Sequence, residues 1–208
     1  MAETIAAPGQ ESTDQDSTLV RESCAGVPGA FETLIGRYER RLFRSALAIT
    51  GNAADAEEVV QESLLRAFQH LSEFRGESKF QTWLTQIVLN TARMKLRKNH
   101  GALWESLDEP HVTEEGTVPR DVAEWRENPE QQLSRGEIEA LLHQALRGLP
   151  PGYREVVVLR DVQLLSTQDT AEILGLSIAN VKTRLLRARL QLRDRLHAVL
   201  QQPQRSKA

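Results

Sequence analysis

Two short segments of the chain are rich in basic side chains, which bind the phosphates of nucleic acids. Residues 178–196 contain six basic residues and one acidic residue, which gives a local charge of +5. Residues 79–98 contain five basic residues and no acidic residue, again +5. The whole chain carries a formal charge of −3, so its basic residues are concentrated. Both segments predict contact with nucleic acid, although an exposed basic helix that only solvates its domain would carry the same charge.

The residues just before and within the C-terminal basic segment have the pattern of a helix-turn-helix motif. Ser166 and Asp169 predict a capping box for a short helix, Thr167–Leu174, and Gly175 favours the left-handed conformation that ends a helix. Ser177 then caps a longer helix. One face of that helix is apolar: Val181, Leu185, Ala188, Leu192 and Leu196. A short helix, a turn with glycine and a longer helix are typical of DNA-binding domains, those of repressors and activators included.

In such a motif the N-terminal part of the second helix enters the major groove of duplex DNA. Arginine and asparagine side chains pair there with guanine and adenine edges, while arginines farther along the helix meet phosphates. The residues expected to contact duplex DNA are therefore Asn180, Lys182, Thr183, Arg184, Arg187 and Arg189.

The other basic segment begins beside three aromatic residues, Phe74, Phe80 and Trp83. Bases of a single strand stack on aromatic rings while cations follow the backbone, so this combination is typical of proteins that bind single-stranded nucleic acid. The alternative is that Phe80 and Trp83 belong to the hydrophobic core. For Trp83, the spacing with the apolar residues that follow favours partial burial.

Apolar residues recur every three or four positions around these side chains, which predicts helices and no strands. The pattern predicts three helices in the N-terminal block, near residues 31–49, 56–71 and 80–91, and Asn52 caps the second of them. The polar face of that second helix is acidic, an ordinary solvated face unless a partner binds it: Asp55, Glu57, Glu58, Gln61 and Glu62. We therefore predict an all-α chain.

Between the two helical blocks, residues 100–132 lose this periodicity and are strongly acidic. Prolines interrupt the stretch, which is typical of a linker. We therefore expect two small helical domains, an N-terminal helical bundle at residues 25–99 and a C-terminal helix-turn-helix domain at 133–200. A flexible acidic linker joins them, and flexible tails are expected at residues 1–24 and 201–208.

The rest of the composition argues against an enzyme, a metalloprotein and a membrane protein. The five histidines are scattered without metal-ligand spacing, and no phosphate loop or nucleophile elbow is present. The sequence therefore predicts no catalytic residue, no metal site and no cofactor. Cys24 is the single cysteine, so no internal disulfide is possible. No signal peptide and no apolar stretch of about 20 residues is found, which predicts a cytoplasmic protein without membrane insertion.

Several of these motifs together resemble one family. The run FRGESKFQTWL at residues 74–84 closely resembles the promoter-melting region of extracytoplasmic-function (ECF) sigma factors of the sigma-70 family. The run DAEEVVQE at 55–62 is similar to the helix with which that family binds the polymerase clamp. In the C-terminal block, AEILG at 171–175 and VKTRLLRAR at 181–189 are similar to the family's second DNA-binding domain. The resemblance spans roughly residues 28–196, with the motifs in the family's order.

This resemblance implies a sigma factor that binds the beta-prime and beta subunits of core RNA polymerase and directs promoter-specific transcription initiation. The polymerase would be bound through the acidic helix face: Asp55, Glu57, Glu58, Gln61 and Glu62. The −10 element of promoter DNA would be read as a melted single strand with one base everted. The residues implied for that strand are Phe74, Arg75, Gly76, Glu77, Ser78, Lys79, Phe80, Trp83, Asn90 and Arg93. The −35 element would be read as duplex by the residues of the helix-turn-helix.

The resemblance also implies an anti-sigma partner and a linker that passes near the polymerase active-site channel, for which a solvated spacer is the alternative. Two stretches depart from the family pattern. Asp169-Thr170-Ala171 stands where the family usually has Glu-Ile-Ala, and Ala179-Asn180 stands where it usually has Gly-Thr. These departures concern the promoter sequence that is read more than the fold. A stand-alone helix-turn-helix regulator is the alternative function, although no dimerisation heptad or ligand-pocket pattern is present.

Overall fold

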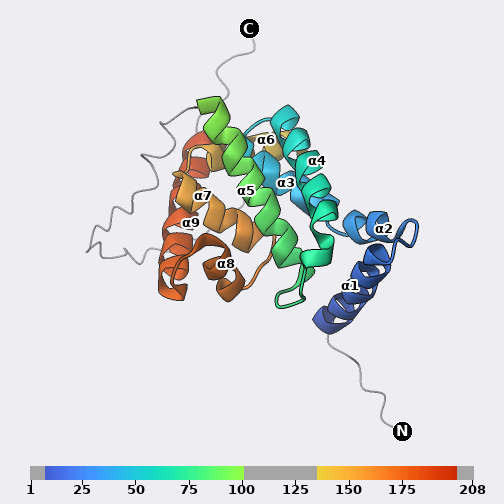
Figure 1. Ribbon diagram of the computed structural model, residues 1–208. Helices are drawn as coiled ribbons and strands as arrows, with labels where there is room; N and C mark the ends of the chain where they lie inside the picture. The colour runs from blue at the N-terminus through green and yellow to red at the C-terminus, as the bar shows by residue number, and fades with distance from the viewer. Residues whose placement is uncertain (1–7, 101–134, 201–208) are drawn as a thin grey trace.

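The computed structural model describes residues 8–100 and 135–200 (Figure 1). Within these ranges the chain forms helices and connecting turns and contains no strand, so the predicted all-α class is confirmed. We refer to residues 8–100 as the N-terminal module and to residues 135–200 as the C-terminal module. The predicted acidic linker, apart from His100, and the predicted C-terminal tail lie outside the described residues.

The N-terminal module is a bundle built around three helices that pack side by side, α3, α4 and α5 (Figure 1). Its elements are α1 (Pro8–Cys24), α2 (Ala30–Gly36), α3 (Glu39–Thr50), α4 (Ala53–Gln69), the 3-10 turn η1 (Leu71–Glu73) and α5 (Phe80–His100). Asn52 caps α4 as expected, because its side chain accepts a hydrogen bond from the backbone N–H of Asp55 at 2.7 Å. Leu42 of α3 and Leu84 of α5 are fully buried where the helices meet.

Helix α1 differs from the flexible tail that we expected at residues 1–24. The carboxylate of Asp16 is buried and accepts hydrogen bonds from the Tyr38 hydroxyl and, at 2.6 Å, from Nη1 of Arg37. Val20, one turn farther along, is buried in the core. The polar composition of α1 predicts no order, but one buried carboxylate with two donors in the turn between α2 and α3 holds it in place.

The C-terminal module surrounds a long helix, α9, that packs against the module's shorter helices. Its elements are α6 (Arg135–Arg147), α7 (Pro151–Val157), the π-turn η3 (Val158–Val162), α8 (Thr167–Leu174) and α9 (Ile178–Leu200). Val181 and Ala188 of α9 are fully buried, as the apolar spacing of that helix predicts. The capping box of α8 is present, with Ser166 and Asp169 bonded to each other's backbone N–H, and Gly175 ends the helix at φ 64°.

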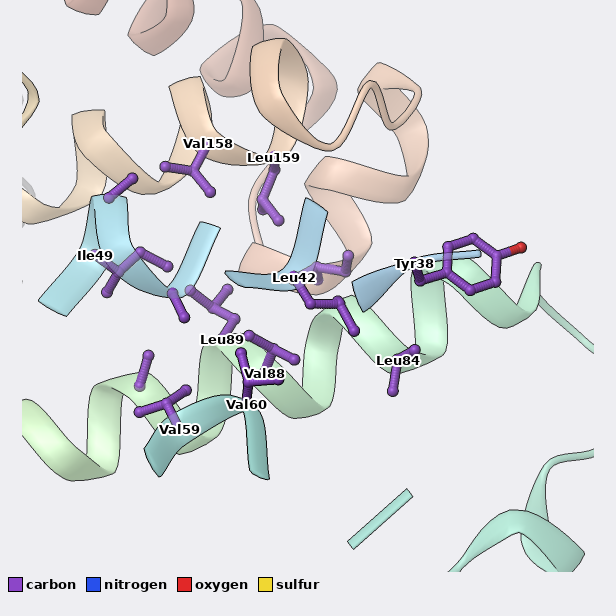
Figure 2. Close-up of a cluster of buried hydrophobic side chains, with 14 of the residues drawn as sticks. Tyr38, Leu42, Ile49, Val59, Val60, Leu84, Val88, Leu89, Val158 and Leu159 are labelled. Carbon is purple, nitrogen blue, oxygen red and sulfur yellow. The ribbon is translucent and has the colours of Figure 1, made fainter. Parts of the chain in front are cut away.

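The two modules pack against each other, which the sequence did not indicate. Figure 2 shows Val158 and Leu159 of the C-terminal module facing the N-terminal helices. Each is 1% exposed, and they share one hydrophobic cluster with Leu42, Ile49 and Leu89. A single core therefore runs through both modules instead of ending at the boundary between them.

Candidate nucleic-acid interface

The five acidic and amide residues predicted to bind polymerase lie together along the outer side of α4. Glu57, Gln61 and Glu62 are exposed. Asp55 and Glu58 lie beside Lys95 of α5. The ammonium Nζ of Lys95 is 3.3 Å from Oδ1 of Asp55 and 2.6 Å from Oε2 of Glu58. We call these five residues of α4 the acidic stripe. The charges of its first part are therefore neutralised by a lysine of the same module, and its C-terminal part faces outward.

Hydrogen bonds around Asp55 fix the charges at this end of the stripe. The side-chain amide of Asn52 donates to Oδ2 of Asp55 at 2.6 Å. This bond, together with the ammonium of Lys95, holds the pKa of Asp55 below its ordinary value of 3.8. The carboxylate of Glu58, by accepting from the same ammonium, raises the pKa of Lys95 above 10.5. Both groups are charged at neutral pH.

A groove of about 550 Å³ lies between α3 and α4 beside the acidic stripe. Phe43 and Val60 contribute apolar surface to its lining, and Arg40, Arg44 and Glu57 contribute charge. Because apolar and charged groups meet here next to an exposed acidic face, the surface has the composition of a protein-docking site.

The loop between η1 and α5 presents polar residues above an aromatic cluster. The side chains of Arg75 and Glu77 are 83% and 80% exposed, and Gly76 between them has φ 73°, a conformation that favours glycine. Beneath them the rings of Phe74 and Phe80 meet edge to face with centroids 5.7 Å apart. The ring of Trp83 lies 5.3 Å from Phe74 and 5.6 Å from Phe80.

Phe80, which belongs to the predicted −10 set, is buried. Its side chain is 3% exposed, so the ring packs inside the module beneath the loop. It presents no accessible face on which a base could stack. Trp83 and Phe74 are half-buried, and the partial burial expected for Trp83 is confirmed. Lys79 is exposed at the start of α5, whereas Ser78 is half-buried.

The two predicted contacts farther along α5 have different surroundings. Asn90 is exposed. Arg93 is half-buried, and its guanidinium donates two hydrogen bonds to Glu155 of the C-terminal module, at 2.7 and 2.6 Å. No sequence pattern indicates this partner, because Glu155 belongs to a different module and precedes the helix-turn-helix.

The predicted duplex-reading residues lie on the outer side of α9, next to the turn that joins it to α8. The hydroxyl oxygen of Ser177 accepts a hydrogen bond from the backbone N–H of Asn180 at 3.2 Å and so caps this helix as predicted. Asn180, Lys182 and Thr183 are exposed, in the first two turns where a recognition helix meets base edges. The remaining members of the set are Arg184 and Arg187, which are half-buried, and Arg189, which is exposed.

Arg189 has an ion-pair partner within its own module. Its guanidinium binds the carboxylate of Asp161 through two hydrogen bonds, at 2.5 and 3.1 Å, and the pair raises the pKa of Arg189. A bidentate pair of this kind orients the guanidinium without removing it from the surface. Sequence reasoning missed Asp161, since no spacing rule connects it to α9.

Two further features, a cluster of metal-binding side chains and a membrane-spanning helix, are absent from the described ranges. Neither module contains a group of three or more His, Cys, Asp or Glu residues that could hold a metal ion. No helix within residues 8–100 and 135–200 is both long and apolar enough to cross a bilayer.

Comparisons with known proteins match the two modules separately and the chain as a whole. The family model for Sigma-70 region 2 matches residues 34–101, and that for Sigma-70 region 4 matches residues 139–192. The chain is 30% identical over 192 residues to RNA polymerase sigma-H factor of Pseudomonas aeruginosa, a match that covers 91% of this chain and 97% of the relative. It is 31% identical over 191 residues to the ECF RNA polymerase sigma-E factor of Haemophilus influenzae, covering 89% and 97%.

A solved structure is similar over both modules together. CnrH in complex with the cytosolic domain of CnrY superposes with a TM-score of 0.64 at 26% identity, covering 89% of this chain and 99% of that chain. The packed arrangement of the two modules is therefore similar to an arrangement seen in a solved relative.

Proposed function

Since the chain belongs to the ECF group of the sigma-70 family and is a sigma factor for transcription initiation, we propose that it reads two separate promoter elements. It would do so as a subunit bound to core RNA polymerase. The N-terminal module reads the −10 element as a melted strand, and the C-terminal module reads the −35 element as duplex. The observation that carries this proposal is that each module presents its own exposed basic side chains, Arg75 and Lys79 in one and Lys182 and Arg189 in the other. Members of the family are non-enzymatic initiation factors, so no catalytic residue is proposed.

The outer side of α4 is the proposed docking surface for core polymerase. Its support is the combination of an exposed acidic stripe with the adjacent groove between α3 and α4. Glu57 belongs to both features, since it is exposed and lines the groove. Lysine and arginine on the partner would pair with the acidic residues, and the apolar lining would exclude water from the contact.

The loop at residues 74–79 is the proposed site for one base of the melted −10 strand. The exposed side chains of Arg75 and Lys79 supply positive charge for phosphates. Phe74 and Trp83 are half-buried, so each offers part of a ring to a base, and buried Phe80 holds both in position. Everting a base costs a few kcal/mol, which these stacking and ionic contacts offset.

The N-terminal half of α9 is the proposed reader of the −35 duplex. Three of its polar residues are exposed, and the helix is held by a buried apolar face, which is the arrangement that inserts a recognition helix into a major groove. Asn180 is suited to adenine, and Arg184 and Arg187 are suited to guanine. Arg189 and the arginines beyond it are suited to phosphates.

An anti-sigma factor is the proposed regulatory partner. The support is the resemblance of the sequence to ECF sigma factors, together with the fact that CnrH, which is similar to this chain over both modules, was solved in complex with a domain of another protein, CnrY. A site of action in the cytoplasm follows from the proposed partnership with RNA polymerase.

Run-off transcription with purified core polymerase tests the proposal. We expect the full chain to direct initiation at a defined subset of start sites in a library of bacterial DNA fragments. The double variant Glu57→Lys/Glu62→Lys should lose both polymerase binding and initiation, because it reverses the charge of the docking surface. The matched control Glu22→Lys changes an exposed acidic residue on α1 and should behave as wild type. Polymerase that ignores the wild-type chain would contradict the proposal.

A further inference from the structure

Asp161 of η3 lies beside the proposed DNA surface of α9 and is not itself a member of it. We propose that Asp161 is a positioning residue for promoter binding: its carboxylate holds the guanidinium of Arg189 so that one edge stays free for a DNA phosphate. The inference rests on the proposed reading of the −35 duplex by α9. It adds to that reading a residue of another element.

The two hydrogen bonds of this pair occupy only one side of the guanidinium. Nε of Arg189 donates to Oδ2 of Asp161 at 3.1 Å, and Nη2 donates to Oδ1 at 2.5 Å. A guanidinium has five N–H groups, so three remain, two on Nη1 and one on Nη2. One N–H group from each of these nitrogens forms a second edge, which matches two phosphate oxygens. The pair therefore fixes the guanidinium and leaves a complete phosphate-binding edge.

Asp161 can serve as a fixed point because the turn that carries it is closed by backbone hydrogen bonds. The N–H of Gln163 donates to the carbonyl of Val158 at 2.9 Å, and that of Leu165 donates to the carbonyl of Leu159 at 3.0 Å. Asp161 lies between these donors and acceptors in the chain, on the exposed side of the turn. Its backbone is thus held by residues of its own module.

The helix that carries Arg189 is fixed against the same part of the module. Figure 1 shows α7, which leads into η3, beside α9. Val156 of α7 and Val181 of α9 are both 0% exposed and belong to one hydrophobic cluster. Ala188, directly before Arg189, is also 0% exposed. Both members of the ion pair therefore extend from backbone that cannot shift without disturbing the core of the module.

The position of Arg189 along α9 suits a phosphate at the rim of the major groove. Arg189 follows Lys182 by seven residues, so both side chains lie on the same face of the helix, about 10 Å apart along its axis. The major groove is about 12 Å wide. When the first turns of α9 enter the groove, Arg189 is therefore level with the sugar–phosphate backbone, and its side chain, 56% exposed, is accessible there.

Holding Arg189 in advance strengthens binding to the promoter. An arginine that becomes ordered only on contact with DNA loses side-chain freedom at that moment, whereas Arg189 is already ordered by Asp161. For one such side chain the difference corresponds to about two- to twelvefold in affinity. The gain applies where α9 is fully docked, since a fixed guanidinium meets a phosphate only in that register. On other DNA a freely moving arginine binds phosphates equally well.

Charge alone makes the opposite prediction for Asp161. A carboxylate near the DNA surface repels phosphates, so its removal would strengthen binding to any DNA sequence. A positioning role predicts that the same removal weakens binding to the promoter and spares binding to other DNA. The sign of the effect on promoter affinity therefore decides between the two roles.

Competition binding with holoenzyme, formed from the full chain and core polymerase, measures this sign. The probes are a promoter fragment that the wild-type chain selects from a DNA library and the same fragment with its −35 block scrambled. We expect Asp161→Asn to weaken promoter binding about two- to twelvefold without weakening binding to the scrambled fragment. The matched control Glu172→Gln, which removes an exposed carboxylate of α8, should change both affinities by the same factor. If Asp161→Asn leaves or strengthens promoter binding, or weakens both complexes equally, the positioning role is overturned.

Changes at Arg189 test whether Asp161 acts through this side chain. Arg189→Lys keeps the positive charge but has a single ammonium and no second edge, so it should weaken promoter binding by a similar factor. In a chain that already carries Arg189→Ala, adding Asp161→Asn should cause no further loss. Wild-type binding by Arg189→Lys, or a further loss in the double variant, overturns the inference. Circular dichroism reports whether helix content is kept; if Asp161→Asn loses helix, Arg189→Lys decides alone.

The proposed function fails by a different result. A wild-type holoenzyme that binds the promoter and the scrambled fragment equally would contradict the reading of the −35 duplex, and Asp161 would then have nothing to position. If the wild-type chain prefers the promoter while Asp161→Asn and Arg189→Lys keep that preference, the inference alone is overturned.

Discussion

The two candidate DNA-contacting surfaces differ in what surrounds them. Most of the predicted contacts on α9 are exposed or half-exposed, and the ion pair of Arg189 with Asp161 stays inside the C-terminal module. The surface of α5 rests on an aromatic cluster and is partly covered by the other module through Arg93 and Glu155. Changes on α9 should therefore alter DNA affinity alone, whereas changes on α5 should alter affinity, stability and module packing together.

The largest expected effect is on the α5 side. Phe80→Ala removes a ring that is 3% exposed and contacts the rings of Tyr38, Phe74 and Trp83. We expect a loss of about 3–5 kcal/mol in the free energy of unfolding, measured by urea titration, because a cavity remains beneath the loop. The control Phe68→Ala truncates a ring that is 57% exposed and should cost about 1 kcal/mol, the range for its single edge contact with Phe31. Equal losses in the two variants would contradict the structural role assigned to Phe80.

The next effect is on the α9 side and concerns affinity. Arg184→Ala and Arg187→Ala should each weaken promoter binding by the holoenzyme by about 1–3 kcal/mol while leaving the affinity for core polymerase unchanged. Unfolding free energies should change by no more than about 0.5 kcal/mol, since no core side chain is removed. Arg21→Ala, at an exposed arginine of α1 outside the proposed DNA surfaces, serves as the control. Normal firing of the promoter by both variants would disprove the assignment of the recognition helix.

Matched helix caps test whether the two modules unfold as one body. Asn52→Ala removes the cap of α4 and Ser166→Ala removes that of α8, each at a cost of about 1 kcal/mol. If the modules share one core, both variants should shift the same cooperative thermal transition. Two transitions, each moved by the cap in its own module, would indicate that the packing between modules is weak.

The smallest effect is the pH dependence of the α4 stripe. Because the pKa of Asp55 is lower in the folded chain than its ordinary value of 3.8, the carboxylate stabilises the fold above that value, and this contribution is lost as pH falls through the lower folded pKa. Carboxyl NMR titration should place the midpoint below 3.8. Asn52→Ala should raise it more than Lys95→Met does, since the hydrogen bond from Asn52 is the main cause. A reversed order would assign the shift to the ion pair.

The features that the sequence predicted correctly are those with local causes. The bounds of α8, Thr167–Leu174, agree with the prediction because a capping box and a terminal glycine lie within ten residues of each other. Val181 and Ala188 are buried because their spacing repeats with the helical turn. The α4 cap at Asn52 was found in the same way.

The features that the sequence did not predict depend on residues far apart in the chain. Order in α1 comes from Asp16 with Tyr38, and closure of the modules comes from pairs such as Arg93 with Glu155. No periodicity or cap marks such pairs, since each member alone has the properties of an ordinary surface residue. Phe80 is buried, but an aromatic residue next to basic charge in a sequence can be either a ring on which bases stack or a ring of the core, so the pattern alone does not decide between them.

The most direct test of two modules reading two separate elements is selection of promoters from a randomised DNA library by holoenzyme, followed by sequencing of the start sites. The wild-type chain should enrich two sequence blocks about 25 base pairs apart, the spacing implied by a −35 duplex and a −10 strand. Asn180→Thr on α9 should change only the upstream block, and Asn90→Ala on α5 should change only the downstream block. A single enriched block, or one block that responds to both substitutions, would contradict the account.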